Sequence, residues 1–321
     1  MELLEHLEDR GYPTDYLLSR IKGRRGLLIR DWRPLVYDAT PLESLSSSRY
    51  RGLASMKSPD AVWRFLVQEY RWVYVQMNGT LRRIFYPFFL YTELRTIFIC
   101  LRHTKEKSAG ITHDLLSASL LSDEIKKVLA ESSDIAAAIA AIERIFLAES
   151  PDFAGLTGIL DEEGLRGVEQ RLTNTYLIHT MDTDLNPLIR GFFKRIIDSR
   201  NVMSLFKYQR LNSKAAPVFI PGGSISVDRL QESIKKDDIF AVTALVRELT
   251  GIRADTPNPT LVESSLYEGI TRFLRRAGKH PFGAEPIMDY LWRCSIEAMN
   301  LSVLFYGKDL ERDTVSPELV H

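Results

Sequence analysis

The sequence predicts an all-α fold, and three observations support this. Apolar residues recur at the helical period in several long stretches, and helix-capping residues stand at the ends of these stretches. Segments with the strict alternation of a β-strand are scarce. With 45% hydrophobic and 26% charged residues, the 321-residue chain has the composition of a protein that folds around a core.

The predicted helices follow one another along the chain. Trp72–Val75 precedes Asn78-Gly79, where a β-hairpin is possible, but the flanking period favours a helix with a turn after it. The stretch from Ile84 to Leu101 is nearly apolar enough for a membrane span. It carries charges at its middle, which favours a buried helix of the core. Capping residues and apolar periodicity predict further helices over residues 125–129, 135–146, 188–197, 239–249 and 266–274.

One short pattern recurs three times near the ends of long apolar helices. An acid opens each copy, and the copies are Glu93-Leu-Arg-Thr-Ile97, Asp198-Ser-Arg-Asn-Val202 and Glu297-Ala-Met-Asn-Leu301. The acids are 105 and 99 residues apart, close to one third of the chain, which indicates a triplicated helical unit. The predicted units are residues 1–108, 109–214 and 215–321.

The repeated acid needs a physical explanation, because a carboxylate inside an apolar helix is costly unless it is compensated. If the units surround a pseudo-threefold axis, the three acids could line a polar central hollow, or each could pair with a basic residue of a neighbouring helix. Pairs that fix helix packing are the favoured interpretation, and a binding role stays open. The candidate axial or partner-contact positions are Glu93, Arg95, Asp198, Arg200, Asn201, Glu297 and Asn300.

Motifs of catalysis and of cofactor binding are missing from the sequence. It contains neither a P-loop nor G-x-G-x-x-G, and neither G-x-S-x-G nor H-E-x-x-H. Asp182–Asn186 resembles the start of a calcium loop, but Pro187 takes the place of the required glycine, which favours a helix N-cap at Asn186. The two cysteines are too few for a disulfide scaffold or a four-ligand zinc site. We therefore predict no catalytic residue, no cofactor and no metal.

The charges of the chain balance, with 42 basic and 42 acidic residues, which argues against a nucleic-acid partner. A local basic segment contains Asp31 as its one opposing acid and could contact anionic headgroups or an acidic partner, although a solvated helix face is favoured. Its basic residues are Arg20, Lys22, Arg24, Arg25, Arg30 and Arg33. The acidic N-terminus lacks the apolar core of a secretory signal, so the cytosol is the expected compartment.

Three parts of the sequence carry a family resemblance. They are the segment from Tyr16 to Arg25, the three acid-centred copies, and above all the block His280-Pro-Phe-Gly-Ala-Glu-Pro-Ile-Met-Asp-Tyr290 that leads to Ile296–Leu301. Together they resemble the central-stalk subunit of V-type and A-type rotary ATPases, called C in prokaryotes and d in eukaryotes. The likeness runs over nearly the whole chain. Met299 departs from it, because the third unit of this family usually has arginine there.

The resemblance implies three similar helical units around a pseudo-threefold axis, which form a funnel. It also implies a non-catalytic subunit, peripheral to the membrane, on the cytoplasmic face of the membrane rotor ring. Such a subunit receives the central shaft (D/F type) and transmits the torque that couples ATP hydrolysis or synthesis to H⁺ or Na⁺ transport. Two alternatives stay open: a helical scaffold or adaptor outside rotary ATPases, and an α-helical enzyme with a pocket at the axis.

Overall fold

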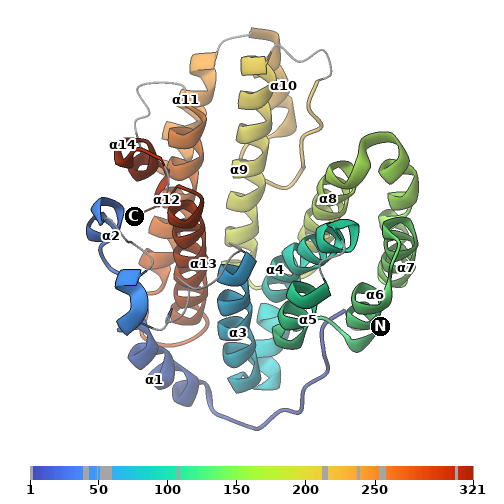
Figure 1. Cartoon of the computed structure of the whole chain (residues 1–321). Coiled ribbons are helices and arrows are strands. Elements are labelled where there is room, and N and C mark those ends of the chain that lie inside the picture. Colours follow the sequence, from blue (N-terminus) through green and yellow to red (C-terminus); the bar gives the residue numbers. More distant parts are fainter. Residues whose placement is uncertain are drawn as a thin grey trace. The chain divides into compact units, whose positions relative to one another are not determined.

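The computed structural model describes residues 3–38, 43–48, 50, 60–106, 109–211, 216–236, 239–252, 258–307 and 310–320. Over these residues the regular structure is helical (Figure 1). Leu4 and Leu121 form an isolated antiparallel bridge. The prediction of an all-α fold is therefore confirmed.

The order of elements repeats three times: two short helical segments are followed by two long helices. The first set is α2 (Arg33–Tyr37), the 3₁₀ turn η1 (Glu43–Ser47), α3 (Asp60–Gln76) and α4 (Gly79–Glu106). The second is α6 (Asp123–Glu131), α7 (Ile135–Leu147), α8 (Leu156–Asp182) and α9 (Pro187–Leu211). The third is α10 (Val227–Lys236), α11 (Ile239–Thr250), α12 (Pro259–Ala277) and α13 (Glu285–Tyr306). Outside the sets are α1 (Thr14–Arg25), α5 (Ala109–Ala118), η3 (Pro151–Phe153), α14 (Arg312–Val315) and η4 (Ser316–Glu318).

The helix ends lie where the capping residues predict them. The side chain of Asp134 accepts a hydrogen bond of 2.9 Å from the backbone N–H of Ala137 at the start of α7. Asn186 accepts from the N–H of Leu188 at 3.0 Å, so the predicted N-cap before Pro187 is confirmed. Gly251, with a φ of 71°, follows the end of α11 in the left-handed conformation that glycine tolerates.

Helix α4 lies in the core. It follows α3 after a turn at 77–78, so the helix–turn interpretation of this region is confirmed and the hairpin is not formed. Phe85, Phe88 and Phe89 are almost completely buried, and Phe89 contacts the rings of Tyr70 and Tyr74 edge to face. By length and composition alone α4 could cross a membrane, but 67% of its most apolar stretch is buried inside the protein, as is typical of a core helix.

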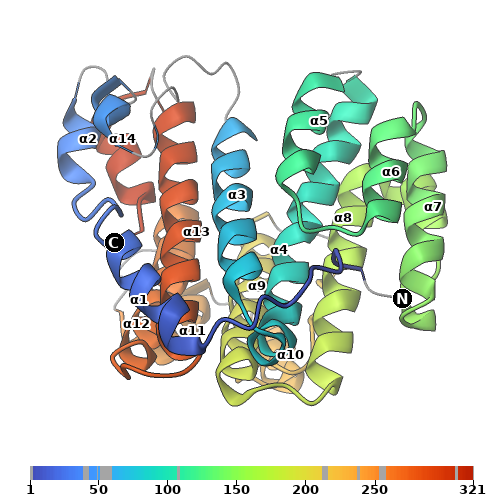
Figure 2. The same ribbon diagram turned by 90° about the horizontal axis from the view of Figure 1, so that it is seen from below.

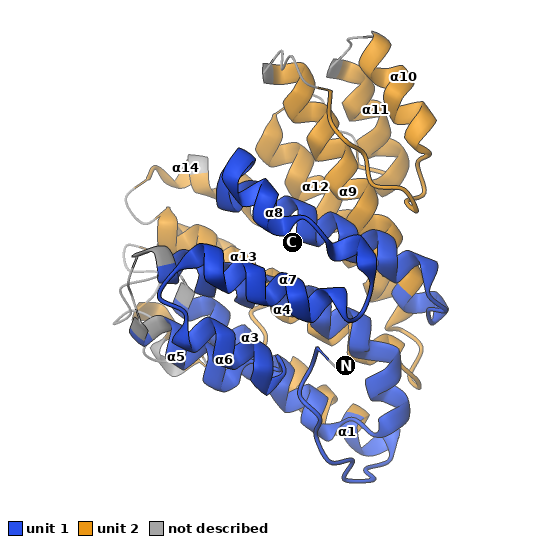
Figure 3. Cartoon of the chain, turned by 90° about the vertical axis from the view of Figure 1, so that its right-hand side faces the viewer, with its two compact units in different colours: residues 1–17, 60–189 blue, residues 18–59, 190–321 orange. Residues whose placement is uncertain are grey.

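Contacts within the chain define two units (Figure 3). Unit 1 comprises residues 1–17 and 60–189, and within it α4 packs against α5, α6, α7 and α8. Figure 2 shows α7 beside both α6 and α8. Unit 2 comprises residues 18–59 and 190–321, and its apolar core joins α9, α10, α11 and α12. The division into three units stays a prediction, and its borders at 108 and 214 lie outside the described residues.

Candidate functional site

The first of the three repeated acids, Glu93, is buried on α4 with 3% of its surface exposed. One carboxylate oxygen accepts a hydrogen bond of 2.6 Å from the backbone N–H of Leu120, and the other accepts from the hydroxyl of Ser119 at 2.8 Å. Burial raises the pKa of Glu93, and these hydrogen bonds oppose the rise. The carboxylate therefore holds the loop that leads into α6.

The second acid, Asp198, lies on α9 and is 1% exposed. Its carboxylate accepts from the N–H of Ser224 at 2.8 and 3.0 Å and from the N–H of Ile225 at 3.1 Å. Desolvation raises the pKa of Asp198, while the two N–H groups and the nearby Arg195 favour the charged form. A Cβ atom on Gly223 would overlap Oδ1 of Asp198, so the close approach of this loop requires glycine.

The third acid, Glu297, lies on α13 and is 3% exposed. Its Oε2 accepts from the hydroxyl of Tyr50 at 2.5 Å, and its Oε1 accepts from the backbone N–H of Ile29. Both donors come from the N-terminal part of the chain, more than 240 residues away in the sequence. The loop held by Glu297 leads into α2.

The three acids thus have one role in common, and we call each acid with its loop an acid clamp. Each carboxylate accepts a backbone N–H from the loop before a short helix: Leu120 before α6, Ile225 before α10 and Ile29 before α2. Each clamp therefore joins the last helix of one set of elements to the start of another set. The interpretation as packing groups is supported, but the donors shown are backbone N–H and hydroxyl groups and not basic side chains of neighbouring helices.

The asparagines of the repeated pattern hold a second segment of backbone. Asn201 donates to the carbonyl of Ile220 and accepts from its N–H, both at 2.8 Å. Asn300 forms the same pair of bonds with Val320, at 2.8 and 3.0 Å. Thr96 occupies this position in the first copy, and its hydroxyl bonds to Glu93 instead. In that copy the chain after the long helix forms α5 and not an extended segment.

The arginines of the pattern differ from the acids. The guanidinium of Arg95 is exposed and lies 3.2 Å from the centre of the Trp63 ring, and Arg200 is half-buried on α9. Glu93 belongs to unit 1, whereas Asp198 and Glu297 belong to unit 2. That the seven candidate positions line one hollow or contact a partner stays a prediction.

Sequence reasoning missed the donors of these clamps. Residues 221–224 are recognisable as a turn before a helix, but no pattern links them to Asp198. Tyr50 and Ile29 carry no sequence signal at all, because their partner Glu297 lies near the other end of the chain.

The fold and the clamps define an all-α protein that uses its buried polar groups to fix loops against long helices. Among the described residues no group of three or more His, Cys, Asp or Glu is placed to hold a metal ion. A sequence model of the family described as the ATP synthase (C/AC39) subunit matches residues 43–315. The match covers most of the chain, which therefore belongs to this family.

Membership makes the protein a subunit of a V/A-type rotary ATPase, and the suspected family is confirmed. The family is a structural part of that complex and is peripheral to the membrane. A search of curated proteins found no match.

Proposed function

We propose that this protein is the central-stalk coupling subunit of a V/A-type ATPase. In this proposal it links the central shaft (D/F type) to the membrane rotor ring on the cytoplasmic face. It transmits torque between ATP hydrolysis or synthesis and H⁺ or Na⁺ transport, without chemistry of its own. The observation that carries the proposal is the family match over residues 43–315.

The acid clamps support a mechanical role. A body that transmits torque must not yield under load, and packed helices resist deformation because protein interiors are as dense as organic crystals. The loops between helices are the more compliant parts of such a body. Glu93, Asp198 and Glu297 tie three of these loops to buried helices, which stiffens the body at those loops.

We also propose that the three sets of elements are equivalent repeats around a pseudo-threefold axis, forming a funnel. The repeated order of short and long helices and the common form of the clamps support this arrangement. A funnel of this kind offers a socket for the end of a shaft.

Co-purification tests the proposed role directly. The full chain, mixed with purified D- and F-type shaft subunits at micromolar concentration, should elute with them from a size-exclusion column. A second mixture with the detergent-solubilised rotor ring should also give a joint peak. An unrelated helical protein of similar size serves as the control. Separate elution in both mixtures would contradict the proposal and favour an adaptor outside the rotor.

A further inference from the structure

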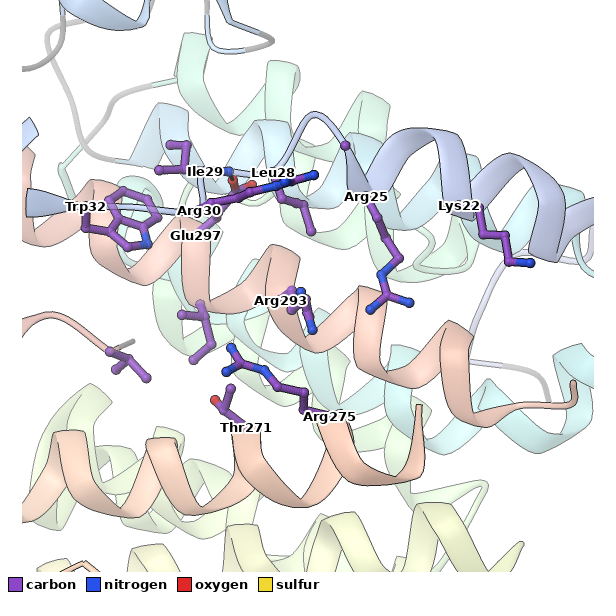
Figure 4. Close-up of a pocket in the computed structure, with 13 residues that line it drawn as sticks. Lys22, Arg25, Leu28, Ile29, Arg30, Trp32, Thr271, Arg275, Arg293 and Glu297 are labelled. Carbon is purple, nitrogen blue, oxygen red and sulfur yellow. Dashed lines mark hydrogen bonds between the residues drawn. The ribbon is translucent and has the colours of Figure 1, made fainter. Parts of the chain in front are cut away.

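Unit 2 contains a cavity of about 590 Å³ between α1, the loop after it, α12 and α13 (Figure 4). Its walls include the buried apolar side chains of Leu28, Trp32 and Ile296. Cavities of this size are typical of sites for small molecules. Five of the side chains that line the cavity are basic: Lys22, Arg25, Arg30, Arg275 and Arg293.

The positive charge of this cavity is only partly compensated. Arg25 and Arg293 share the buried carboxylate of Asp289, at 2.9 and 3.1 Å. Among the described residues that line the cavity, Glu297 is the one carboxylate, and its oxygens accept hydrogen bonds from Ile29 and Tyr50.

Three further cations therefore remain without an ion pair to any described residue: Lys22, Arg30 and Arg275. Even with both nearby carboxylates counted as charged, the formal charge around the cavity is positive.

The five cations come from separate parts of the chain, so their meeting is a property of the fold. A basic end of α1 alone would be explained by the helix dipole, which favours cations at a helix C-terminus. Arg275 is likewise in the last turn of α12, but the dipole does not explain Arg293 in the interior of α13 or Arg30 in the loop after α1, nor why these cations line one cavity. Figure 4 shows the side chains of Arg25, Arg275 and Arg293 pointing into the space between their helices. Like charges brought together in this way repel one another unless an anion joins them.

We propose that this cavity binds an anion with several clustered phosphate groups. Guanidinium groups match phosphate oxygens in paired hydrogen bonds, and three of the four arginines reach the cavity from different elements. A single carboxylate would leave most of the cations uncompensated, whereas a polyphosphate engages several at once. Clustered phosphates occur both in soluble polyphosphates and in phosphoinositide headgroups, and the cavity chemistry is the same for both.

Calorimetry with inorganic tripolyphosphate tests the soluble source, using the full chain at low ionic strength. We expect saturable binding at one site, weakened about tenfold by Arg275→Gln and by Arg30→Gln because each removes a charged contact. Both side chains are exposed and form no ion pair with described residues, so the melting temperature without ligand should hardly change. If either variant misfolds, Lys22→Gln replaces it.

The matched control is Arg276→Gln, which removes the same charge from the same helix outside the cavity lining. It should leave the affinity within about twofold, since only long-range electrostatics changes. In a parallel arm, flotation of the protein with phosphatidylcholine vesicles, with and without a phosphoinositide, tests the lipid source.

Binding in either arm that depends on Arg275 and not on Arg276 supports the proposal and identifies the source. Three results would overturn it: no saturable binding of either probe, equal weakening by Arg276→Gln, or binding of an acidic peptide such as polyglutamate but of neither phosphate probe. Loss of shaft binding with this site intact would affect only the coupling role, so the two proposals can fail separately.

Discussion

At the scale of single residues, Asp198 shows how a carboxylate can be accommodated inside an apolar helix. Its burial alone would favour the neutral form, and desolvation does raise its pKa. Two backbone N–H groups, of Ser224 and Ile225, recover part of this cost by donating to the carboxylate. Within their loop these N–H groups have no strand or helix partner. The acid therefore needs the loop's donors, and the loop needs the acid as an acceptor.

Replacing Asp198 with alanine should lower the free energy of unfolding by about 2 kcal/mol, because it leaves buried backbone donors without an acceptor. Urea denaturation measures the change. Asp182→Ala, at an exposed position on α8, is the control and should cost less than about 0.5 kcal/mol. If Asp198→Ala is as mild as the control but abolishes co-elution with the shaft, Asp198 contacts a partner and does not hold the loop.

A side chain at Gly223 should collide with the Asp198 carboxylate, and a double-mutant cycle can test this. Gly223→Ala should cost about 1–3 kcal/mol, since its Cβ overlaps the Asp198 carboxylate. In the Asp198→Ala background the cost should fall by about 1 kcal/mol or more, because the overlapping atom is gone. Gly158→Ala, in α8 at a position where an added Cβ would meet no neighbouring side chain, should be neutral or slightly stabilising. An equal cost of Gly223→Ala in both backgrounds would show that the backbone, and not the acid, imposes glycine.

At the scale of elements, the N-terminal segment reinforces the first clamp. The N–H of Glu5 donates to the carbonyl of Leu120 at 2.7 Å, and the N–H of Ser122 donates to the carbonyl of Leu3 at 2.9 Å. The side chain of Glu5 also bonds to Arg71 on α3 and to Lys126 on α6, at 2.7 and 2.9 Å. The loop before α6 is therefore held from two sides.

This arrangement predicts a pH dependence. The hydrogen bond from Arg71 is the largest cause that lowers the pKa of Glu5, from 4.5 to about 2. A lowered pKa in the folded state adds stability that is complete above pH 4.5 and is lost as the pH falls toward about 2. Glu5→Gln should cost about 1 kcal/mol at neutral pH, and its penalty should shrink over that acidic range. Urea denaturation at several pH values measures it, and a penalty that stays constant would contradict the assignment.

Asn300 should control the order of the C-terminal segment. Its side chain bonds both to the N–H and to the carbonyl of Val320, so Asn300→Ala should speed hydrogen exchange at the Val320 amide by about tenfold or more. Ser302→Ala on the same helix is the control, because Ser302 bonds only to the carbonyl of Ala298 within α13. Unchanged exchange at Val320 in Asn300→Ala would mean that other contacts hold this segment.

Helices were largely predictable from the sequence, whereas the clamps were only half predictable. Periodicity and caps such as Asp134 and Gly251 are local signals, so they fix where a helix begins and ends. The even spacing of Glu93, Asp198 and Glu297 indicated that something repeats. The purpose of the repeated acid depends on which loop donates to it. The donors to Glu93 and Asp198 follow these acids by 26 or 27 residues, whereas the backbone donor to Glu297 precedes it by 268. Such distances are set by tertiary packing and leave no local pattern.

At the scale of the whole molecule, the beginning of the chain is shared between the two units. Residues 1–17 belong to unit 1, while 18–59 belong to unit 2 with residues 190–321. In unit 2 the N-terminal part supplies Arg25 to Asp289 and the N–H of Ile29 to Glu297. Two buried acids of α13 therefore depend on residues from the other end of the sequence.

Two truncations separate these roles. Removing residues 1–13 takes away the segment that contacts the loop at 119–122 and the start of α4, so hydrogen exchange should rise in those two places and stay slow in α13. Removing residues 1–31 also strips Asp289 and Glu297 of Arg25 and Ile29. Asp289 keeps Arg293 and Glu297 keeps Tyr50, but each buried carboxylate loses one of its donors, so unit 2 should lose about 2 kcal/mol or more and α13 should exchange faster.

Adding Glu297→Leu to the longer truncation should restore part of the protection of α13, because it removes one of the two buried carboxylates that have lost a donor. Hydrogen exchange followed by mass spectrometry compares the three proteins with the full chain. Equal protection of α13 in both truncations would show that the N-terminal part only covers unit 2 and that Glu297 finds its donors elsewhere. A graded loss with partial rescue would instead show that α13 depends on the donors that residues 14–31 supply to its buried acids.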